Sequence, residues 1–202
     1  MTLTKRLAWI SSLFVGMILL GTMILAVPSQ DPGSQQGDND SRIQKGFAIA
    51  PVHLNLEGKN RALVGLGSYI VNGQAVCSAC HTCPSFTPGH SPFNGKEEQI
   101  NTAGYLAGGV PFAPTPFVSR NITPDATGKP AGLTFEDFEH LIRTGEDPDH
   151  FTPLLQIMPW PTFRKMNDHD LRAIYEYLSA IPSNPRKDSD GPGHCSGPDL
   201  DF

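Results

Sequence analysis

The sequence predicts an all-α domain in which a few helices are joined by long loops, preceded by a single N-terminal transmembrane helix. The transmembrane helix is predicted by residues 7–27, LAWISSLFVGMILLGTMILAV, which hold no charged side chain over 21 residues and are long enough to span a bilayer. The helical domain is predicted by three later segments whose apolar residues recur with a helical period, with no clear strand pattern between them. Of the 202 residues, 20 are glycine and 19 are proline, so loops and turns should occupy much of the chain.

The flanks of the apolar segment predict its orientation. Lys5 and Arg6 precede it, and acidic side chains follow it, which places the N-terminus in the cytoplasm and the rest of the chain outside. The segment is longer than the apolar region of a signal peptide, and Pro28 follows it without a clean cleavage site. We therefore expect residues 1–27 to be an uncleaved signal anchor, with a cleaved signal peptide as the alternative. Either kind of N-terminal segment would export the rest of the chain.

Composition predicts the domain boundaries. Residues 28–45, PSQDPGSQQGDNDSRIQK, contain almost no large apolar residue, and such a segment cannot bury enough surface to fold. We expect residues 28–57 to be a disordered tether and lead-in, residues 58–182 to form the folded domain, and residues 183–202 to form a C-terminal tail.

The first helix of the domain is predicted over residues 58–71, GKNRALVGLGSYIV, directly before a cluster of cysteines. Leu63, Leu66 and Ile70 fall on one side of this segment, as the apolar stripe of a core-facing helix does.

The second helix is predicted over residues 133–145, LTFEDFEHLIRTG. Thr134 is the expected N-cap, with Asp137 three residues on, and Gly145 is the expected stop.

The third helix is predicted within NDHDLRAIYEYLSAIP. Asn167 is its expected cap, Leu171, Ile174 and Leu178 its inward face, and Pro182 its end.

The charge of the chain excludes one class of partner. The formal net charge is −5, and without Lys5 and Arg6 the residues after 27 carry 13 basic and 20 acidic side chains, or −7. Proteins that bind nucleic acid present basic surfaces, so we expect no nucleic-acid partner.

The stretch CSACHTCP carries the chemistry and has more than one interpretation. Cys77-x-x-Cys80-His81 is the c-type haem attachment pattern, in which two thiols meet the porphyrin and the imidazole meets the iron. With Cys83 the stretch also looks like the start of a ferredoxin cluster motif, for which Cys195 would have to be the distant fourth ligand. A thioredoxin-like CxxC or half of a zinc site is a further alternative, but no CxxC elsewhere in the sequence and no zinc-spaced histidine pair accompanies this stretch.

An electron-transferring haem iron needs a sixth ligand, usually His or Met. Beyond residue 27 the only methionines are Met158 and Met166. Pro159 disfavours helix at Met158, which suits a side chain presented from a loop, and Met158 is therefore the predicted axial ligand. Met166, which directly precedes the cap of the last helix, and a histidine are the less favoured alternatives.

Three segments, taken with the helix before CxxCH and the Met-Pro loop, resemble class I-type cytochrome c domains. They are most similar to the cytochrome c subunit domains of membrane-bound alcohol-dehydrogenase-type complexes. The segments are SRNITPD with the following TG (residues 119–128), LIRTGEDPD (residues 141–149) and MPWPTFRKMNDHDLRAIYEYL (residues 158–178).

The resemblance implies a cytochrome c fold around one haem c, attached through Cys77 and Cys80 and ligated by His81 and Met158. It also implies one-electron transfer rather than enzymatic activity. The chain would be a carrier or the cytochrome subunit of an oxidoreductase complex at the bacterial cytoplasmic membrane, with its haem domain in the periplasm. Its redox partners would be a dehydrogenase or quinol-side donor and an oxidase-side acceptor. The subunits it resembles often carry two or three haem motifs, whereas this chain has one.

Two cysteines remain for a structural role. An exported domain can keep disulfides, and Cys83 and Cys195 form an even pair once the haem motif is set aside. We predict a Cys83–Cys195 disulfide that ties the tail back to the haem region.

Several alternatives stay open on the sequence. The chain could be a haem enzyme or gas sensor with an open sixth iron site, as in a peroxidase, although no distal acid–base set is readable. Asn121 and Thr123 could bind a haem propionate or form a turn before Pro124. Trp160 could pack on the porphyrin edge.

Overall fold

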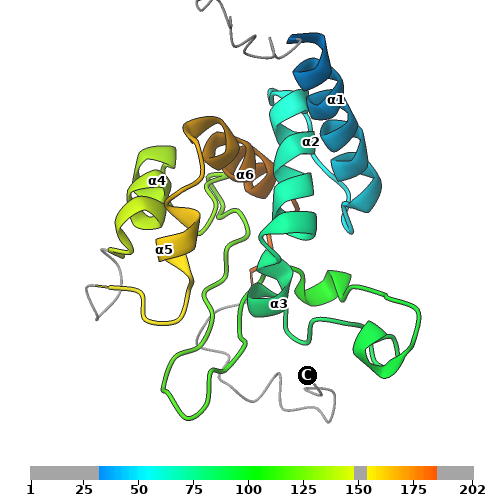
Figure 1. The fold of residues 1–202 in the computed structure, drawn as a ribbon. Helices are drawn as coiled ribbons and strands as arrows, with labels where there is room; N and C mark the ends of the chain where they lie inside the picture. Colours follow the sequence, from blue (N-terminus) through cyan, green and yellow to red (C-terminus); the bar gives the residue numbers. More distant parts are fainter. Residues whose placement is uncertain (1–31, 148–153, 186–202) are drawn as a thin grey trace, which may run out of the picture. The chain divides into compact units, whose positions relative to one another are not determined.

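The computed structural model describes residues 32–147 and 154–185. Within these ranges the regular elements are helices, with isolated bridges and no strand, which confirms the all-α prediction. The elements in chain order are α1 (Pro32–Ile49), α2 (Arg61–Tyr69), the π-helix η1 (Ile70–Gln74), α3 (Cys77–His81), the short 3₁₀ turns η2 (Pro92–Asn94) and η3 (Thr102–Gly104), α4 (Phe135–Thr144), α5 (Trp160–Phe163) and α6 (Asp168–Ala180). Figure 1 shows their arrangement.

The core lies where α2 crosses α6. Gly67 of α2 lies so close to α6 that a Cβ added to it would overlap the backbone oxygen of Ala173, and the glycine therefore allows the two helices to approach closely. Large side chains that are almost fully buried surround this crossing, namely Val64, Leu66, Ile70, Leu106, Leu171 and Tyr177. The crossing orients the C-terminal end of α2, from which the cysteine motif follows.

The three predicted helices of the domain are present, with small differences in their ends. The segment predicted over 58–71 is α2 followed by η1, and it begins after Asn60, whose side chain accepts hydrogen bonds from the N–H groups of Ala62 and Leu63. The helix predicted over 133–145 is α4, and the one predicted after Asn167 is α6.

The caps of α4 and α6 are those predicted. Thr134 and Asp137 form a reciprocal capping box at the start of α4, and Gly145 ends it in the left-handed conformation with φ of 77°. The Asn167 side chain accepts a hydrogen bond from the N–H of Asp170 at 2.7 Å at the start of α6.

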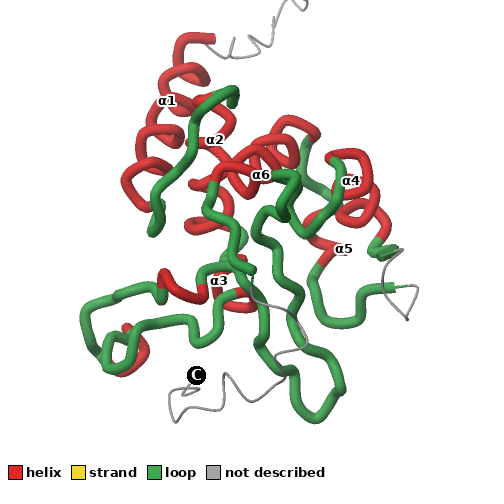
Figure 2. The backbone as a smooth tube through the Cα atoms, turned by 180° about the vertical axis from the view of Figure 1, so that it is seen from behind, coloured by secondary structure: helices red, strands yellow, loops and turns green. Residues whose placement is uncertain are grey.

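The prediction that residues 28–57 are a disordered tether is wrong for residues 32–45, because they belong to α1. Figures 1 and 2 both show α1 alongside α2. Ile43 and Phe47 pack against Gly65, and Arg61 lies over the Phe47 ring with 4.4 Å from its guanidinium carbon to the ring centroid. Contacts such as these with α2, and the hydrogen bond from the Ser68 hydroxyl to the Gly46 carbonyl at 2.7 Å, hold the helix in place. Composition alone does not reveal tertiary contacts of this kind.

The predicted transmembrane segment, residues 7–27, lies outside the described residues. Among the helices that the structure describes, none is long and apolar enough to cross a membrane.

Candidate haem-binding site

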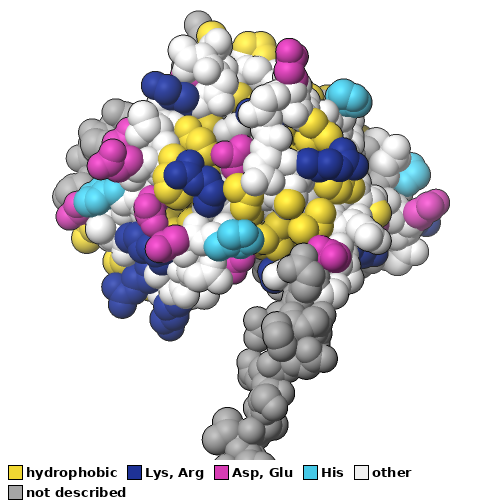
Figure 3. Space-filling view, turned by 90° about the horizontal axis from the view of Figure 1, so that it is seen from above, with side chains coloured by type: hydrophobic (Ala, Val, Ile, Leu, Met, Phe, Trp, Pro, Cys, Tyr) yellow, Lys and Arg dark blue, Asp and Glu magenta, His cyan; other side chains and the backbone are white. Residues whose placement is uncertain are grey.

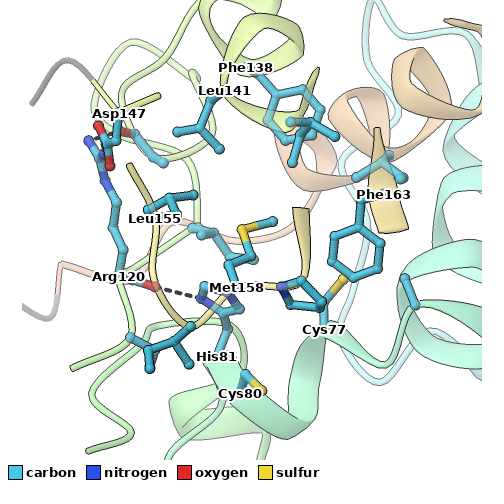
Figure 4. A pocket seen from close by; sticks show the side chains of 18 of the residues that line it. Cys77, Cys80, His81, Arg120, Phe138, Leu141, Asp147, Leu155, Met158 and Phe163 are labelled. Carbon is cyan, nitrogen blue, oxygen red and sulfur yellow. Dashed lines mark hydrogen bonds and ion pairs between the residues drawn. The ribbon is translucent and has the colours of Figure 1, made fainter. Parts of the chain in front are cut away.

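A mostly apolar cavity of about 220 Å³ opens between α3, α4, α6 and the loops that connect them. Cys77, Cys80, His81 and Met158 all line it, and Figure 4 shows His81 and Met158 in its middle. Besides the cysteines and the histidine, its polar lining consists of Ser119, Arg120, Asp147 and Gln156. The structure therefore brings together the four side chains that the sequence singled out. Cys77, Cys80 and His81 come from one short motif, whereas Met158 comes from a loop far along the chain.

The backbone before α3 turns sharply to present the motif. The α2 helix widens into the π-turn η1, closed by the Ala75 N–H donating to the Ile70 carbonyl at 2.7 Å. Val76 then adopts the left-handed conformation, with φ of 51°, and is 53% exposed. A β-branched residue is rarely found there, and such strain is typical of functional positions. The single turn of α3 that follows carries Cys77 and Cys80 three residues apart on one face.

The two thiols of the motif are free, and the Cys77 residue is partly buried whereas Cys80 is exposed at the cavity. Burial raises the pKa of Cys77 to about 12, and the neighbouring Cys80 contributes to this rise. Burial also raises the pKa of Cys80. Both side chains are therefore neutral thiols at physiological pH. In the part of the chain that the structure describes, no group of three or more His, Cys, Asp and Glu side chains is placed to bind a metal ion.

His81 is oriented by a backbone carbonyl. Its Nδ1 lies 2.8 Å from the Arg120 carbonyl oxygen. Because a carbonyl only accepts, Nδ1 carries the proton in this hydrogen bond, and in the neutral ring Nε2 is the nitrogen whose lone pair can bind a metal.

The segment that holds this carbonyl is itself clamped by a neighbouring loop. The Gly109 N–H donates to the Ser119 carbonyl at 2.9 Å, and the Ile122 N–H donates to the Leu106 carbonyl at 3.0 Å. At Gly108, with φ of 70°, an added Cβ would lie 2.5 Å from the carbonyl carbon of Arg120. Only glycine fits this close approach.

Met158 lies in a loop, as predicted, and is partly buried against the core. The Leu155 N–H donates to the Gly145 carbonyl at 2.8 Å, and the Trp160 N–H donates to the Met158 carbonyl at 2.8 Å. These bonds fix the loop on both sides of the methionine. Met166 lines the same cavity, so geometry alone does not eliminate the alternative ligand.

Trp160 does not line the cavity. Its Nε1–H donates to the Leu155 carbonyl at 3.1 Å, and its ring covers Gly145 at the end of α4. It positions the Met158 loop, and the aromatic side chains of the cavity are instead Phe112, Phe117, Phe138 and Phe163.

Asn121 and Thr123 form the turn that the sequence allowed, and they also hold the segment after α6. The Asn121 amide donates to the Asn184 carbonyl at 2.8 Å, and the Asn184 N–H donates to the Thr123 hydroxyl at 3.1 Å. These two residues do not line the cavity.

Cys83 differs from the other cysteines of the motif. Its side chain is 3% exposed and is disulfide-bonded. A sulfur in a disulfide is not a thiolate ligand, which disfavours the iron–sulfur interpretation. The predicted partner, Cys195, lies outside the described residues, so the Cys83–Cys195 pairing stays a prediction.

Sequence reasoning did not single out Arg120 and Asp147 as site residues. They form an ion pair at the edge of the cavity, with 3.0 Å between Arg120 Nη1 and Asp147 Oδ2. Arg120 lies in the motif SRNITPD and Asp147 in LIRTGEDPD, but neither motif indicates that the two side chains contact each other.

Comparison with known proteins finds relatives that are cytochrome c subunits of dehydrogenases. The chain is 34% identical over 139 residues, 66% of its length, to the gluconate 2-dehydrogenase cytochrome c subunit of Pantoea cypripedii. It is 32% identical over 118 residues, 58% of its length, to the alcohol dehydrogenase (quinone) cytochrome c subunit of Gluconacetobacter polyoxogenes. It is also 30% identical over 119 residues, 59% of its length, to the alcohol dehydrogenase (quinone) cytochrome c subunit of Gluconobacter oxydans.

These matches cover only part of each relative: 27%, 21% and 21% of its length, respectively. No protein-family model matches the chain. The resemblance inferred from the motifs is nevertheless confirmed, because the chain's homologues are cytochrome c subunits of gluconate 2-dehydrogenase and of quinone alcohol dehydrogenase.

Proposed function

We propose that the chain is a c-type cytochrome that carries one covalently bound haem and transfers single electrons on the outer side of the cytoplasmic membrane. One observation carries the proposal: Cys77, Cys80, His81 and Met158 line a single apolar cavity. The relatives are cytochrome c subunits, and this independent finding agrees with the donor set of the cavity.

The residues of the cavity fit a haem. Cys77 and Cys80 would form the thioether links, and His81, through Nε2, and Met158, through its sulfur, would be the protein ligands of the iron. Apolar walls contributed by α4 and α6 would exclude water from the group. When bound, the haem supplies a one-electron couple, and a thioether ligand raises its potential relative to an imidazole.

The proposal assigns the chain to electron transfer and not to catalysis. With side chains on both axial positions, a substrate would have no access to the iron. The chain would act as a carrier or as the cytochrome subunit of an oxidoreductase complex. It would receive electrons from a dehydrogenase or quinol-side donor and pass them to an oxidase-side acceptor.

Location and attachment belong to the same proposal. Residues 1–27 would anchor the chain in the cytoplasmic membrane with its N-terminus inside, which places the haem domain in the periplasm. The Cys83–Cys195 disulfide would be compatible with that compartment.

Axial ligation is tested by spectroscopy of the exported domain produced with haem-maturation machinery. We expect the oxidised protein to show the weak near-infrared band of Met–Fe(III) ligation. Met158→Ala should abolish this band, and the matched variant Met166→Ala should keep it. Loss of the band in Met166→Ala alone would assign the ligand to Met166. Ready binding of carbon monoxide to the unmutated reduced protein would favour the alternative of an open sixth site.

A further inference from the structure

We infer that the Arg120–Asp147 ion pair is a positioning device that couples the orientation of His81 to the placement of the Met158 loop. The inference rests on the proposed function, because it concerns the two proposed iron ligands. It assigns neither Arg120 nor Asp147 to the iron.

The first half of the coupling is the backbone of Arg120. Its carbonyl oxygen accepts the Nδ1–H of His81 at 2.8 Å, so any displacement of residue 120 changes the orientation of the imidazole. Hydrogen bonds from outer groups of this kind set the tautomer, direction and basicity of a ligating histidine.

The second half is the side chain of the same residue. Arg120 Nη1 donates to Asp147 Oδ1 at 3.2 Å and to Oδ2 at 3.0 Å, and Nη2 donates to the Ala131 carbonyl at 3.0 Å. The guanidinium therefore ties together three segments at the cavity edge, with Nη1 on the carboxylate and Nη2 on the Ala131 carbonyl. Its planar fork holds these two nitrogens at fixed positions, whereas the ammonium group of a lysine has one nitrogen for both partners.

Asp147 connects this fork to the methionine loop. Its side chain is 2% exposed, whereas that of Arg120 is 29% exposed. It follows Gly145, whose carbonyl accepts the Leu155 N–H, and Glu146, which bridges to Leu154. Asp147 thus lies beside the base of the loop that carries Met158, and Figure 4 shows the pair on one side of the cavity.

Because the Asp147 carboxylate is buried, loss of its ion pair with Arg120 should disturb the surrounding structure. Removing the guanidinium breaks this ion pair at a carboxylate that has almost no access to water, and we expect the weakened segment to shift. That movement would displace the base of the Met158 loop and relax residue 120, so both proposed ligands would be affected together.

The coupling is tested with Arg120→Gln, Arg120→Lys and Asp147→Asn in the haem-loaded chain. The readout is the alkaline pH dependence of the near-infrared Met–Fe(III) band, which reports the equilibrium for loss of the methionine ligand. We expect each variant to shift this equilibrium toward ligand loss by about 10- to 100-fold, the range for partners of metal ligands. Arg120→Lys should recover only part of the effect, because the fork is lost.

Two controls separate coupling from general stability. Glu146→Gln changes the adjacent carboxylate, which is exposed and pairs with His140 at 3.0 Å, and Arg172→Gln removes a guanidinium that does not line the cavity. Both should leave the ligand equilibrium unchanged. The double variant Arg120→Leu with Asp147→Leu removes both charges of the pair and should be less affected than the sum of Arg120→Leu and Asp147→Leu made singly.

The outcomes distinguish this inference from the proposed function. If Arg120→Gln and Asp147→Asn lower the thermal midpoint but leave the ligand equilibrium at the unmutated value, the pair is only structural and the inference is wrong. If the unmutated chain holds no covalent haem, the proposed function itself fails.

Discussion

At the scale of single residues, the orientation of the proposed ligands depends on hydrogen-bonding groups that would not themselves bind the iron. His81 is oriented by the carbonyl of Arg120, and Met158 is fixed by the N–H of Trp160. Such partners define the geometry of a metal site as much as the ligands do. Cys77, Cys80 and His81 could be predicted because their spacing is itself the signal. Arg120 and Asp147 could not, because their pairing depends on how two distant loops meet.

Asp125 provides a test of the turn beside the site. Hydrogen bonds from the Lys129 N–H and from Thr127 lower the pKa of Asp125 below its ordinary value of 3.8. A carboxyl whose pKa is lower in the folded state contributes stability above the unfolded pKa and loses it as the pH falls through the folded pKa.

We therefore expect Asp125→Asn to be less stable than the unmutated domain at neutral pH. The difference in free energy of unfolding should shrink as the pH falls below about 3.8. Denaturant unfolding at several pH values measures it. A difference that grows on acidification would contradict the sign of the shift.

At the scale of elements, local signals were sufficient for some helices and not for others. The capping box of Thr134 and the left-handed Gly145 define α4 by short-range chemistry, so its ends could be predicted closely. α1 could not be predicted, because its stability comes from tertiary contacts of Ile43 and Phe47 with α2. The π-turn before α3 likewise has no signature in the sequence.

The crossing of α2 and α6 should be highly sensitive to one methyl group. Gly67→Ala would force a Cβ into the Ala173 carbonyl and to 2.7 Å from the Tyr177 Cβ. We expect a loss of about 1–3 kcal/mol or more, as in other overpacked cores, measured by thermal or denaturant unfolding. The matched variant is Gly73→Ala, whose Cβ would meet its nearest atoms at 3.6 Å and beyond. A similar loss in both variants would show that the close approach is not the cause.

The docking of α1 is tested by Gly46→Ala, whose Cβ would overlap the carbonyl oxygen of Gly65. We expect amide hydrogen exchange over residues 38–49 to accelerate, while the amides of α6 stay protected. Gly37→Ala is the control in the same helix, because nothing lies within 4 Å of its Cβ. Unchanged protection in Gly46→Ala would contradict the packing of α1 on α2.

At the scale of the whole molecule, the fold brings α3, α4, α5, α6 and the loops between them around one cavity. The helical class and the three helices of the domain were predictable, because each is encoded locally. The four proposed ligands come from short motifs, and their role at an iron stays a prediction. The walls of the cavity could not be predicted, because residues such as Phe138 and Phe163 come to line it only through the packing of α4, α5 and α6.

The net negative charge follows from the composition of the chain and is not visible as a single acidic patch in Figure 3. The net charge is −5, yet the face shown in Figure 3 mixes acidic, basic and histidine side chains around apolar ones. Net charge affects the rate of encounter with a redox partner more than it identifies where the partner docks.

The central claim is covalent attachment of one haem through Cys77 and Cys80, and the most direct test is the intact mass of the denatured exported domain. Produced with maturation machinery, the unmutated chain should retain the mass of one haem after denaturation. The Cys77→Ser and Cys80→Ser double variant should lose it, and Cys83→Ser should keep it. Absence of haem mass from the unmutated chain, or its retention when both cysteines are replaced, would contradict the account.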